Sequence, residues 1–355
     1  MGKMTIGDLR QKQALPLEAK IIVSKQRIKE WYEHWDGEVY ISNSGGVDST
    51  VLSHLVHSLY PDVPDVYCDT GLEYPELRNF IMSKSNVIML KPQMGFIDVI
   101  KKYGYPIISK EISFVISQAR KGNNWGLCKI NGKKTNGRDD IYGKSMMKWK
   151  FLLDADFNVD NQCCKEMKKK LAHKYEKQSG QKAFIGTMTD ESLLRQTEWL
   201  KHGCNAFDGT RPISTPLSFW TKSDVLHYIV KYNIPYVKEI YGDIIEKDGI
   251  YTTTKQKRTG CIFCGFGCHL EKEPNKFQML ATINPQLYDY CMRGGKYDES
   301  GMWIPDKGLG MAKVLDYINV KWWNDGDEAE RDEYRAKYKE KEEIEQSRKK
   351  SPQED

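Results

Sequence analysis

The chain has 355 residues, of which 39% are hydrophobic and 29% charged, and its formal net charge is +5. This length predicts one large domain or two unequal ones, and the composition is typical of a globular protein that buries a sizeable core. No run of about 18 apolar residues is present, so no membrane-spanning helix is expected. The first residues lack a charged-then-apolar export signal, so the expected compartment is the cytoplasm.

The charge is unevenly distributed along the chain. Residues 325–355 carry 12 acidic and 8 basic side chains, which leaves +9 on residues 1–324. Basic residues concentrate in residues 129–177, a region that could attract a nucleotide or a nucleic-acid acceptor; a solvated charged face is the alternative. The cations of this region include Lys129, Lys133, Lys134, Arg138, Lys148, Lys150, Lys165, Lys168, Lys169 and Lys170.

Hydrophobic periodicity predicts an alternation of helices and strands. Apolar residues at three-and-four spacing predict helices, and short apolar runs that end in turns predict strands. The expected helices cover residues 16–34, the segment after the turn at 44–46 up to Pro61, 75–83, 164–178 and 222–232, and the expected strands cover 39–42, 65–68, 87–90, 183–186 and 212–214. This order predicts an α/β fold with a doubly wound, mostly parallel sheet covered by helices.

The same pattern predicts four regions. Residues 1–38 form an amino-terminal helical segment, and residues 39–254 form the α/β domain. The periodicity loosens over residues 107–160, which predicts an inserted irregular region or lid. Residues 255–324 are a Cys-rich segment. Residues 325–355 are a charged tail, expected to be a solvent-exposed helix or disordered.

The segment VYISNSGGVDSTVLSHLV, residues 39–56, passes from a predicted strand through a Ser-Gly-Gly turn into a predicted helix. Such a turn at the end of a parallel strand lies where ligands bind, and the next helix directs free N–H groups at it. Gly45 and Gly46 allow the backbone to approach a phosphate closely. Asp48 would repel phosphates unless a divalent cation lay between them, which implies Mg²⁺. A plain connecting turn is the alternative.

The spacing differs from both the Walker loop and GxGxxG. The stretch SGGVDS resembles the signature SGGxDS of the PP-loop ATP pyrophosphatases, members of the Rossmann-like adenine nucleotide alpha hydrolase-like superfamily that cleave ATP between the α- and β-phosphates. The resemblance implies that ATP and Mg²⁺ bind here. The implied contact residues are Ser42, Ser44, Gly45, Gly46, Val47, Asp48, Ser49 and Thr50.

Three further segments resemble the adenylyl-sulfate and phosphoadenylyl-sulfate reductase branch of that superfamily. They are CDTGLEYPE at 68–76, GTMTDESLLR at 186–195 and PLSFWTKSDVLHYIVKYNIPY at 216–236. The resemblance implies that the nucleotide site also includes Asp69, Thr70, Gly71, Gly186 and Glu191, with Ser192 and Arg195 as candidates for the substrate side. The expected catalytic residues are Asp48, Ser49 and Arg195.

Nine cysteines without an export signal favour metal binding or thiol chemistry over structural disulfides. Four of them form two close pairs, Cys163 with Cys164 and Cys261 with Cys264, which suits either a tetrahedral Zn²⁺ or an iron-sulfur cluster. Cys268 is an alternative ligand. Adjacent cysteines followed by a distant CxxC resemble the 4Fe-4S pattern of cluster-bearing members of this branch, and this resemblance favours the cluster.

Two departures from the reductases concern function. Those enzymes attack their substrate with a cysteine in a C-terminal E-C-G-L-H segment, whereas no cysteine follows Cys291 here. Their first loop also tends to be degenerate, whereas this chain keeps SGGVDS. Both departures favour ATP-dependent sulfur transfer, closest in features to the sulfurtransferase of DNA phosphorothioation and more distantly similar to tRNA thiolation enzymes.

The leading hypothesis is that an acceptor, with nucleic acid as a candidate, is adenylylated and that sulfur from a donor system such as a cysteine desulfurase then displaces AMP. One alternative is a sulfonucleotide reductase that releases sulfite and takes its thiol from Cys268, Cys291 or a partner. Another is a non-catalytic nucleotide-sensing module, which would bind ATP and show no change in turnover after Asp48→Ala.

Overall fold

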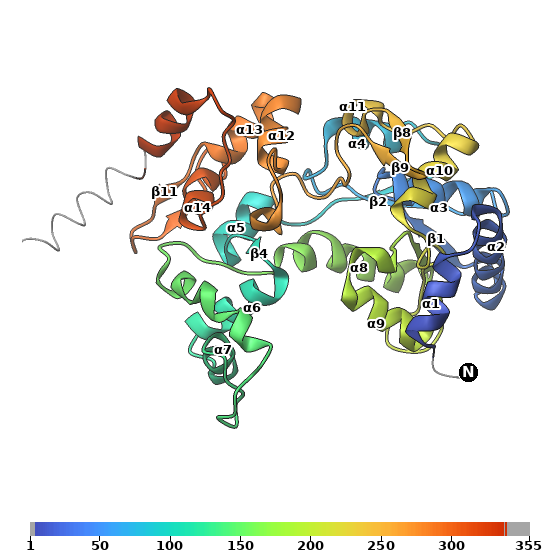
Figure 1. The fold of residues 1–355 in the computed structure, drawn as a ribbon, viewed down its shortest axis with the longest axis horizontal. Helices are drawn as coiled ribbons and strands as arrows, with labels where there is room; N and C mark the ends of the chain where they lie inside the picture. The colour runs from blue at the N-terminus through green and yellow to red at the C-terminus, as the bar shows by residue number, and fades with distance from the viewer. Residues whose placement is uncertain (1–3, 337, 339–355) are drawn as a thin grey trace, which may run out of the picture. The chain divides into compact units, whose positions relative to one another are not determined.

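The computed structural model describes residues 4–336 and 338, and the chain divides into two compact units (Figure 1). Unit 1 consists of Met1–Pro92 and Lys168–Gly260, and unit 2 consists of Gln93–Met167 and Cys261–Asp355. The chain therefore leaves unit 1 near residue 92 and returns near 168. The predicted insertion at 107–160 and most of the Cys-rich segment at 255–324 belong to the same unit.

Unit 1 is built on a six-stranded, mostly parallel sheet with the order β3-β2-β1-β5-β7-β6. β1 pairs in parallel with both β2 and β5, and only the edge strand β6 runs antiparallel to its neighbour β7. The strands are β1 (Val39–Ser42), β2 (Asp65–Cys68), β3 (Val87–Leu90), β5 (Lys182–Ile185), β6 (Asn205–Ala206) and β7 (Ile213–Ser214). The predicted α/β fold with a mostly parallel sheet is confirmed.

The direction of strand addition reverses beside β1, with β2 and β3 on one side and β5, β7 and β6 on the other. In open α/β sheets, the crevice at the carboxyl ends of the strands next to such a reversal is where ligands bind. Val39, Tyr40 and Ile41 are buried, so β1 is a central core strand. The turn that follows β1 therefore lies at the position in this sheet best suited to a ligand.

Helices complete unit 1. In α3, Val51, Leu52, Leu55 and Val56 are fully buried, which fixes the helix that follows the turn. The helices are α1 (Ile6–Gln13), α2 (Leu17–His34), α3 (Val47–His57), α4 (Pro75–Met82), α8 (Lys170–Ser179), α9 (Leu193–His202), α10 (Lys222–Lys231) and α11 (Lys238–Tyr241). An antiparallel hairpin of β8 (Ile244–Lys247) and β9 (Ile250–Thr253) packs against α10.

Unit 2 is mainly helical, with short strand pairs. Residues 107–160, predicted to be irregular, include two helices that pack tightly, because the Cα of Gly126 lies close to the backbone of Ala119. The elements are α5 (Phe96–Tyr103), β4 (Ile107–Ile108), α6 (Lys110–Arg120), α7 (Asn124–Ile130), β10 (Gly265–Phe266), α12 (Lys276–Ile283), α13 (Pro285–Met292), β11 (Lys296–Tyr297), β12 (Trp303–Ile304) and α14 (Met311–Tyr317). Three segments of 3-10 helix, Gly143–Ser145, Met147–Asp154 and Cys268–Leu270, lie between them.

In the first part of the charged tail most side chains are exposed, but two buried tyrosines pack it within unit 2. Residues 328–336 are helical, and Tyr334 and Tyr338 are buried. Arg335 and Tyr338 both bind the carboxylate of Asp316 in α14, at 2.7 and 2.6 Å. Residues 339–355 lie outside the described residues. Among the helices that the structure describes, none has the length and apolar character that a membrane crossing requires.

Candidate active site

The turn after β1 is held by hydrogen bonds among its own residues. The hydroxyl of Ser49 donates to the carbonyl of Gly46 at 2.9 Å and accepts from the amide of Ser44 at 3.2 Å. Gly45 has a φ of +76°, and a Cβ there would lie 2.9 Å from the carbonyl oxygen of Leu77. The turn thus requires glycine at this position, and Ser49, a predicted catalytic residue, shapes the loop.

Hydroxyl groups from distant segments surround the second glycine. A Cβ on Gly46 would lie 3.3 Å from both the hydroxyl of Tyr241 and that of Thr259. The Tyr241 hydroxyl also accepts from the amide of Val47 at 3.3 Å and lies 2.6 Å from the Thr259 hydroxyl. Burial raises the pKa of Tyr241 to about 12, so it remains a neutral hydrogen-bonding group.

Asp48, in the first turn of α3, pairs with Lys222, whose Nζ lies 2.7 and 2.9 Å from the two carboxylate oxygens. Lys222 is the first residue of α10, and Thr221 caps that helix through a capping box with Asp224. Asp224 also receives the ammonium of the buried Lys20 at 2.6 Å. The polar residues of the WTKSDV stretch therefore fix the start of α10, and this fixed start directs Lys222 at Asp48.

The segment after β5 supplies a second group of charges. Glu191 forms ion pairs with Arg195 and with Arg258, the latter at 2.6 Å. Burial lowers the pKa of Arg195, the positive charge of Arg258 acts in the same direction, and the charge of Asp48 opposes both. Gly186 lies against the start of α3, because a Cβ there would be 3.2 Å from the carbonyl oxygen of Asp48. The structure therefore brings predicted residues of two distant segments to one site.

The segment after β2 has its own network. Asp69 accepts from Arg78 at 3.0 Å, and Thr70 donates to Glu73 at 2.8 Å. Glu73 in turn binds Lys168 at 2.8 Å. Gly71 is exposed, with a φ of +68° and open space where a Cβ would lie. Asp69 and Thr70 are thus engaged with neighbouring side chains.

The buried carboxylate of Asp65 supports the turn through hydrogen bonds. Asp65 accepts from the Nδ2 of Asn43 at 3.0 Å and from the hydroxyl of Ser53 at 3.0 Å. The Oδ1 of Asn43 accepts from the amide of Gly45 at 2.9 Å. Asp65 therefore orients Asn43, which in turn orients the turn. Neither Asn43 nor Asp65 was predicted to belong to the site.

Asp65→Asn is expected to destabilise unit 1 by about 1–3 kcal/mol, because an amide nitrogen would then face a buried donor. The affinity for ATP should fall as well, since Asn43 loses its fixed orientation. Urea denaturation and calorimetric titration with ATP measure the two effects. Asp62→Asn, at an exposed carboxylate three residues earlier, is the matched control and should change neither. Unaltered stability and affinity in Asp65→Asn would show that the network does not support the turn.

The residues around the turn fit a nucleotide with its divalent metal. The carboxylate of Asp48 already holds a cation, the ammonium of Lys222, and the turn leads directly into the start of α3, whose first amides have no partner within the helix. Hard oxygen ligands such as this carboxylate are those that Mg²⁺ prefers. Asp48 would hold the metal, while Arg195 and Arg258 would supply positive charge for the phosphates.

The five predicted ligand cysteines all lie in unit 2. The amide of Tyr105 donates to the carbonyl of Asn158, and the amide of Gly265 donates to the carbonyl of Pro106, so both cysteine-bearing segments flank the stretch 105–108. In the part of the chain that the structure describes, however, no three His, Cys, Asp or Glu side chains are grouped so that they could hold a metal ion. As placed, Cys163, Cys164, Cys261, Cys264 and Cys268 do not fit a cluster or a Zn²⁺ ion.

Metal analysis of full-length protein purified without oxygen tests the ligand prediction. The resemblance to cluster-bearing proteins predicts about four iron and four sulfide per chain, whereas the placement of the cysteines in the structure predicts neither. The double substitution Cys261→Ser/Cys264→Ser should remove both, whereas Cys128→Ser should remove neither. Colourless protein with one Zn²⁺ would favour the structural-metal alternative, and protein without metal would contradict both.

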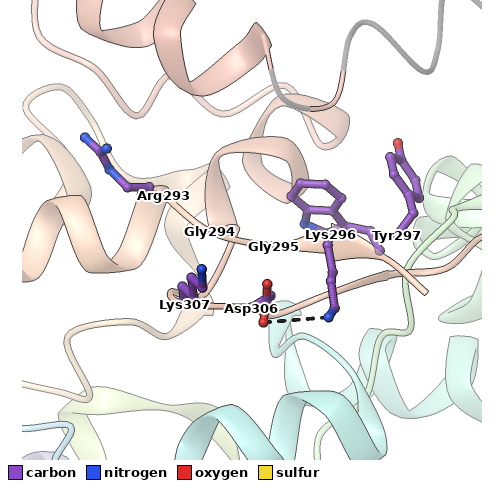
Figure 2. Close-up of a pocket in the computed structure, with 8 residues that line it drawn as sticks. Arg293, Gly294, Gly295, Lys296, Tyr297, Asp306 and Lys307 are labelled. Atoms are coloured by element: carbon purple, nitrogen blue, oxygen red, sulfur yellow. Dashed lines mark ion pairs between the residues drawn. The ribbon is translucent and has the colours of Figure 1, made fainter.

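A further cavity of about 460 Å³ lies within unit 2, between α13 and β12 (Figure 2). Gly294 and Gly295 have φ values of +82° and +89°, and a Cβ on Gly295 would lie 2.2 Å from the ring of Trp303. Figure 2 shows Lys296 extending toward Asp306, 3.8 Å away. Gly295 is therefore required by the close packing of this turn on Trp303, and Gly294 by its approach to the backbone of Asp306 and Gly308, 2.6 Å from a Cβ there.

Several lysines of the predicted basic region are paired. Lys129 binds Asp140, and Lys133 binds Asp139 at 2.6 Å. Lys168 binds Glu73. These pairs reduce the net positive charge that residues 129–177 offer to a nucleic acid.

The family comparison matches the site just described. The model of the phosphoadenosine phosphosulfate reductase domain matches residues 38–106 and 119–256, which is more than half of the chain and includes every unit 1 residue of the site except Arg258 and Thr259. The chain belongs to the phosphoadenosine phosphosulfate reductase family. The match includes the turn at residues 44–46 and the segments after β2 and β5. The family lies within the PP-loop superfamily, as the sequence resemblance predicts.

Individual relatives of this family member match over shorter stretches. A phosphoadenosine 5'-phosphosulfate reductase of Photorhabdus laumondii is 30% identical over 119 residues, which are 33% of this chain and 43% of that protein. One of Serratia proteamaculans is 32% identical over 77 residues, 22% of this chain and 32% of that protein. These matches span less than half of each relative. A phosphate complex of the Candida auris enzyme covers 66% of this chain and 90% of its own, at 13% identity and a TM-score of 0.36.

Besides Asn43 and Asp65, sequence reasoning missed four residues of the site: Lys222, Tyr241, Arg258 and Thr259. Lys222 lies inside a segment that resembles the family, at the first position of a predicted helix, where a charged side chain can point away from the core. No local pattern marks Tyr241, Arg258 or Thr259, because only the path of the chain through α11 and from β9 to Gly260 brings them beside the turn.

Proposed function

We propose that unit 1 binds ATP with Mg²⁺ and cleaves it between the α- and β-phosphates, transferring the adenylyl group to an acceptor. The observation that carries the proposal is the pairing of Asp48 with Lys222 beside an intact glycine turn. A carboxylate at a phosphate-binding turn is useful only if a cation bridges it to the phosphates. A site for an already activated nucleotide releases no pyrophosphate and therefore has less need of such a carboxylate.

Each group has a role in this reaction. An oxygen nucleophile of the acceptor attacks the α-phosphorus, and the bond from that phosphorus to the bridging oxygen breaks, so that pyrophosphate leaves with the bond electrons. The amides at the start of α3, together with Arg195 and Arg258, stabilise the negative charge that develops on the leaving group. Bound Mg²⁺ would supply further charge neutralisation at the phosphates. Glu191 orients the two arginines.

The fate of the adenylylated acceptor is sulfur transfer in this proposal. A sulfur nucleophile displaces AMP from the acceptor, and the sulfur comes from a donor system such as a cysteine desulfurase. Nucleic acid is the candidate acceptor, supported by exposed cations of residues 129–177 such as Lys134 and Arg138. Binding of DNA or RNA should weaken steeply as salt rises, because phosphate contacts release counterions.

The test is a product analysis. Full-length protein is incubated with ATP and Mg²⁺, with separate DNA, RNA and small-molecule fractions as acceptors and with a sulfide source. We expect AMP and pyrophosphate in equal amounts with at least one fraction. No pyrophosphate with any fraction, from protein whose metal content has been restored, would refute the proposal.

A sulfonucleotide reductase is the second candidate, and the names of the curated relatives favour it. A reductase requires a reactive thiol, and the two cysteines proposed for that role, Cys268 and Cys291, are poorly suited to it. Burial raises the pKa of Cys268 to about 12 and raises that of the fully buried Cys291 further. The attacking species is the thiolate, so neither thiol is activated as a nucleophile.

Alkylation measures the reactivity of these thiols directly. At pH 8 a thiol with a pKa of about 12 has a thiolate fraction about 1,000-fold below that of a thiol at the ordinary value of 9.0. Iodoacetamide should therefore modify the half-exposed Cys128 within minutes and leave Cys268 and Cys291 unmodified in native protein, as mass spectrometry of peptides would show. Rapid labelling of Cys268, together with sulfite release from adenylyl sulfate, would establish the reductase instead.

A further inference from the structure

A cavity of about 490 Å³ lies within unit 1, between the start of α10 and the β8–β9 hairpin. One of its lining residues is Lys222, the residue whose ammonium binds both carboxylate oxygens of Asp48. Lys222 therefore links the cavity to Asp48, which follows the turn at residues 44–46 that we propose to bind phosphate, the phosphate turn. Its volume lies in the range of sites for small molecules.

The lining combines apolar surface with positive charge. Leu226, Ile250 and Tyr251 supply the apolar part, and Lys257 supplies a second ammonium. The wall is fixed in place, because the ring of Tyr251 stacks on His227 with centroids 4.5 Å apart and its amide donates to the hydroxyl of Ser223 at 2.9 Å. A ligand of this cavity would have an apolar stem and an anionic group.

The charge balance of the cavity depends on the phosphate turn. Asp48 neutralises Lys222, and Asp190 is the carboxylate of the cavity lining. When a metal ion bound to ATP occupies Asp48, the two cations compete for one carboxylate and Lys222 becomes available to the cavity. Lys222 and Lys257 then face one carboxylate, that of Asp190, so the cavity attracts an anionic ligand only after the nucleotide has bound.

The cavity borders one part of the predicted nucleotide site and lies apart from the other in the sheet. Asp190 of its lining follows β5 and is adjacent to Glu191, whereas Asp69, Thr70 and Gly71 follow β2, on the other side of β1. A molecule in the cavity would thus approach the turn at residues 44–46 from the β5 side.

We propose that this cavity binds the acceptor, and that the acceptor carries a carboxylate or phosphate group on a short apolar stem, recognised by Lys257 and by Lys222 once MgATP is bound. The inference rests on the proposed function, because it assumes a nucleotide at the turn. It makes the second substrate a small anionic molecule, in place of the nucleic-acid candidate, and adds a residue, Lys257, that selects it.

The test uses three acyl sulfamoyladenosines, adenylate mimics that the adenosine half anchors at the turn. Their acyl groups are succinyl, which ends in a carboxylate, phosphonopropanoyl, which ends in a phosphonate, and levulinyl, which is uncharged and of similar size. Calorimetric titrations of the full chain are made with Mg²⁺ and pyrophosphate present. We expect at least one acidic probe to bind about 10-fold more tightly than the levulinyl probe, the magnitude of a partly screened ion pair.

Two lysine variants make the result specific. Lys257→Met should reduce the preference for the acidic probe to less than about 2-fold while its affinity for ATP stays at the wild-type value. Lys247→Met, at an exposed lysine of the same hairpin outside the cavity, should keep the full preference. A carboxylate preference identifies a small acid as the acceptor, and a phosphonate preference identifies a phosphate-bearing one.

Equal affinities for all three probes in the wild-type protein, or an undiminished preference in Lys257→Met, would overturn the inference while leaving ATP binding intact. Failure of the wild-type protein to bind ATP would instead refute the proposed function itself. The two failures are therefore distinguished by the ATP titration alone.

Discussion

Asp48→Asn is expected to lower the rate of pyrophosphate release by about 100- to 1,000-fold, the effect of removing one group that stabilises charge in the transition state. The substitution keeps the shape of the side chain and removes the charge that holds Mg²⁺. It should hardly change stability, because the Asp48 and Lys222 side chains are 25% and 29% exposed and such pairs contribute about 0–1 kcal/mol. Steady-state kinetics and urea denaturation of the same preparation separate the two effects.

Asp243→Asn is the matched control for this substitution. Asp243 pairs with Lys238 at 2.6 Å in the same unit, but both side chains are exposed and lie outside the described site. Its activity should equal that of the wild-type protein. If Asp48→Asn retained full turnover, Asp48 would not be the metal ligand; if it bound ATP as the wild-type protein does and neither protein turned over, the non-catalytic module would be the better account.

Gly45→Ala is expected to destabilise unit 1 by about 2–4 kcal/mol and to weaken ATP binding by at least about 10-fold. A left-handed backbone costs an L-residue about 1–2 kcal/mol, and here the new methyl would also lie 2.9 Å from the carbonyl oxygen of Leu77. Relief of that contact requires movement of the turn or of α4, at a cost of about 1–3 kcal/mol. Urea denaturation and ATP titration measure the two changes.

Gly180→Ala separates the cost of the backbone from the cost of the contact. Gly180 ends α8 with a φ of +80°, similar to that of Gly45, but nothing lies within 4 Å of a Cβ there. We expect a loss of about 1 kcal/mol and unchanged ATP affinity. Equal losses of stability in the two variants, with no effect of either on ATP binding, would show that the close approach to Leu77 does not shape the site.

The strands and helices that could be predicted are those whose local pattern agrees with their burial. β1 and α3 appear where the periodicity places them, because Val39 to Ile41 and Val51 to Val56 face the core of unit 1. The helix predicted at residues 16–34 corresponds to α2. The phosphate turn could be predicted for the same reason: strand, glycine turn and helix are contiguous in the chain.

The features that could not be predicted depend on contacts distant in the chain. Lys222 and Asp48 are separated by 174 residues, and Tyr241 and Val47 by 194. The division into units also depends on distant contacts, because unit 2 is made of two separate stretches of the chain, residues 93–167 and 261–355. The packing of the tail also depends on distant contacts: its composition is highly charged, yet the hydroxyls of Tyr334 and Tyr338 donate to Asp289 and Asp316, 45 and 22 residues earlier.

Phosphorus NMR of the products formed from ATP carrying ¹⁸O in the α–β bridge tests the central claim most directly. The protein is incubated with Mg²⁺, a sulfide source and each acceptor fraction, and the label is followed. Cleavage at the α-phosphorus predicts AMP without the bridging label, labelled pyrophosphate in equal amount, and loss of both products in Asp48→Asn. Formation of ADP and orthophosphate, or of pyrophosphate at an undiminished rate in Asp48→Asn, would contradict the assignment of this turn as an ATP pyrophosphatase site.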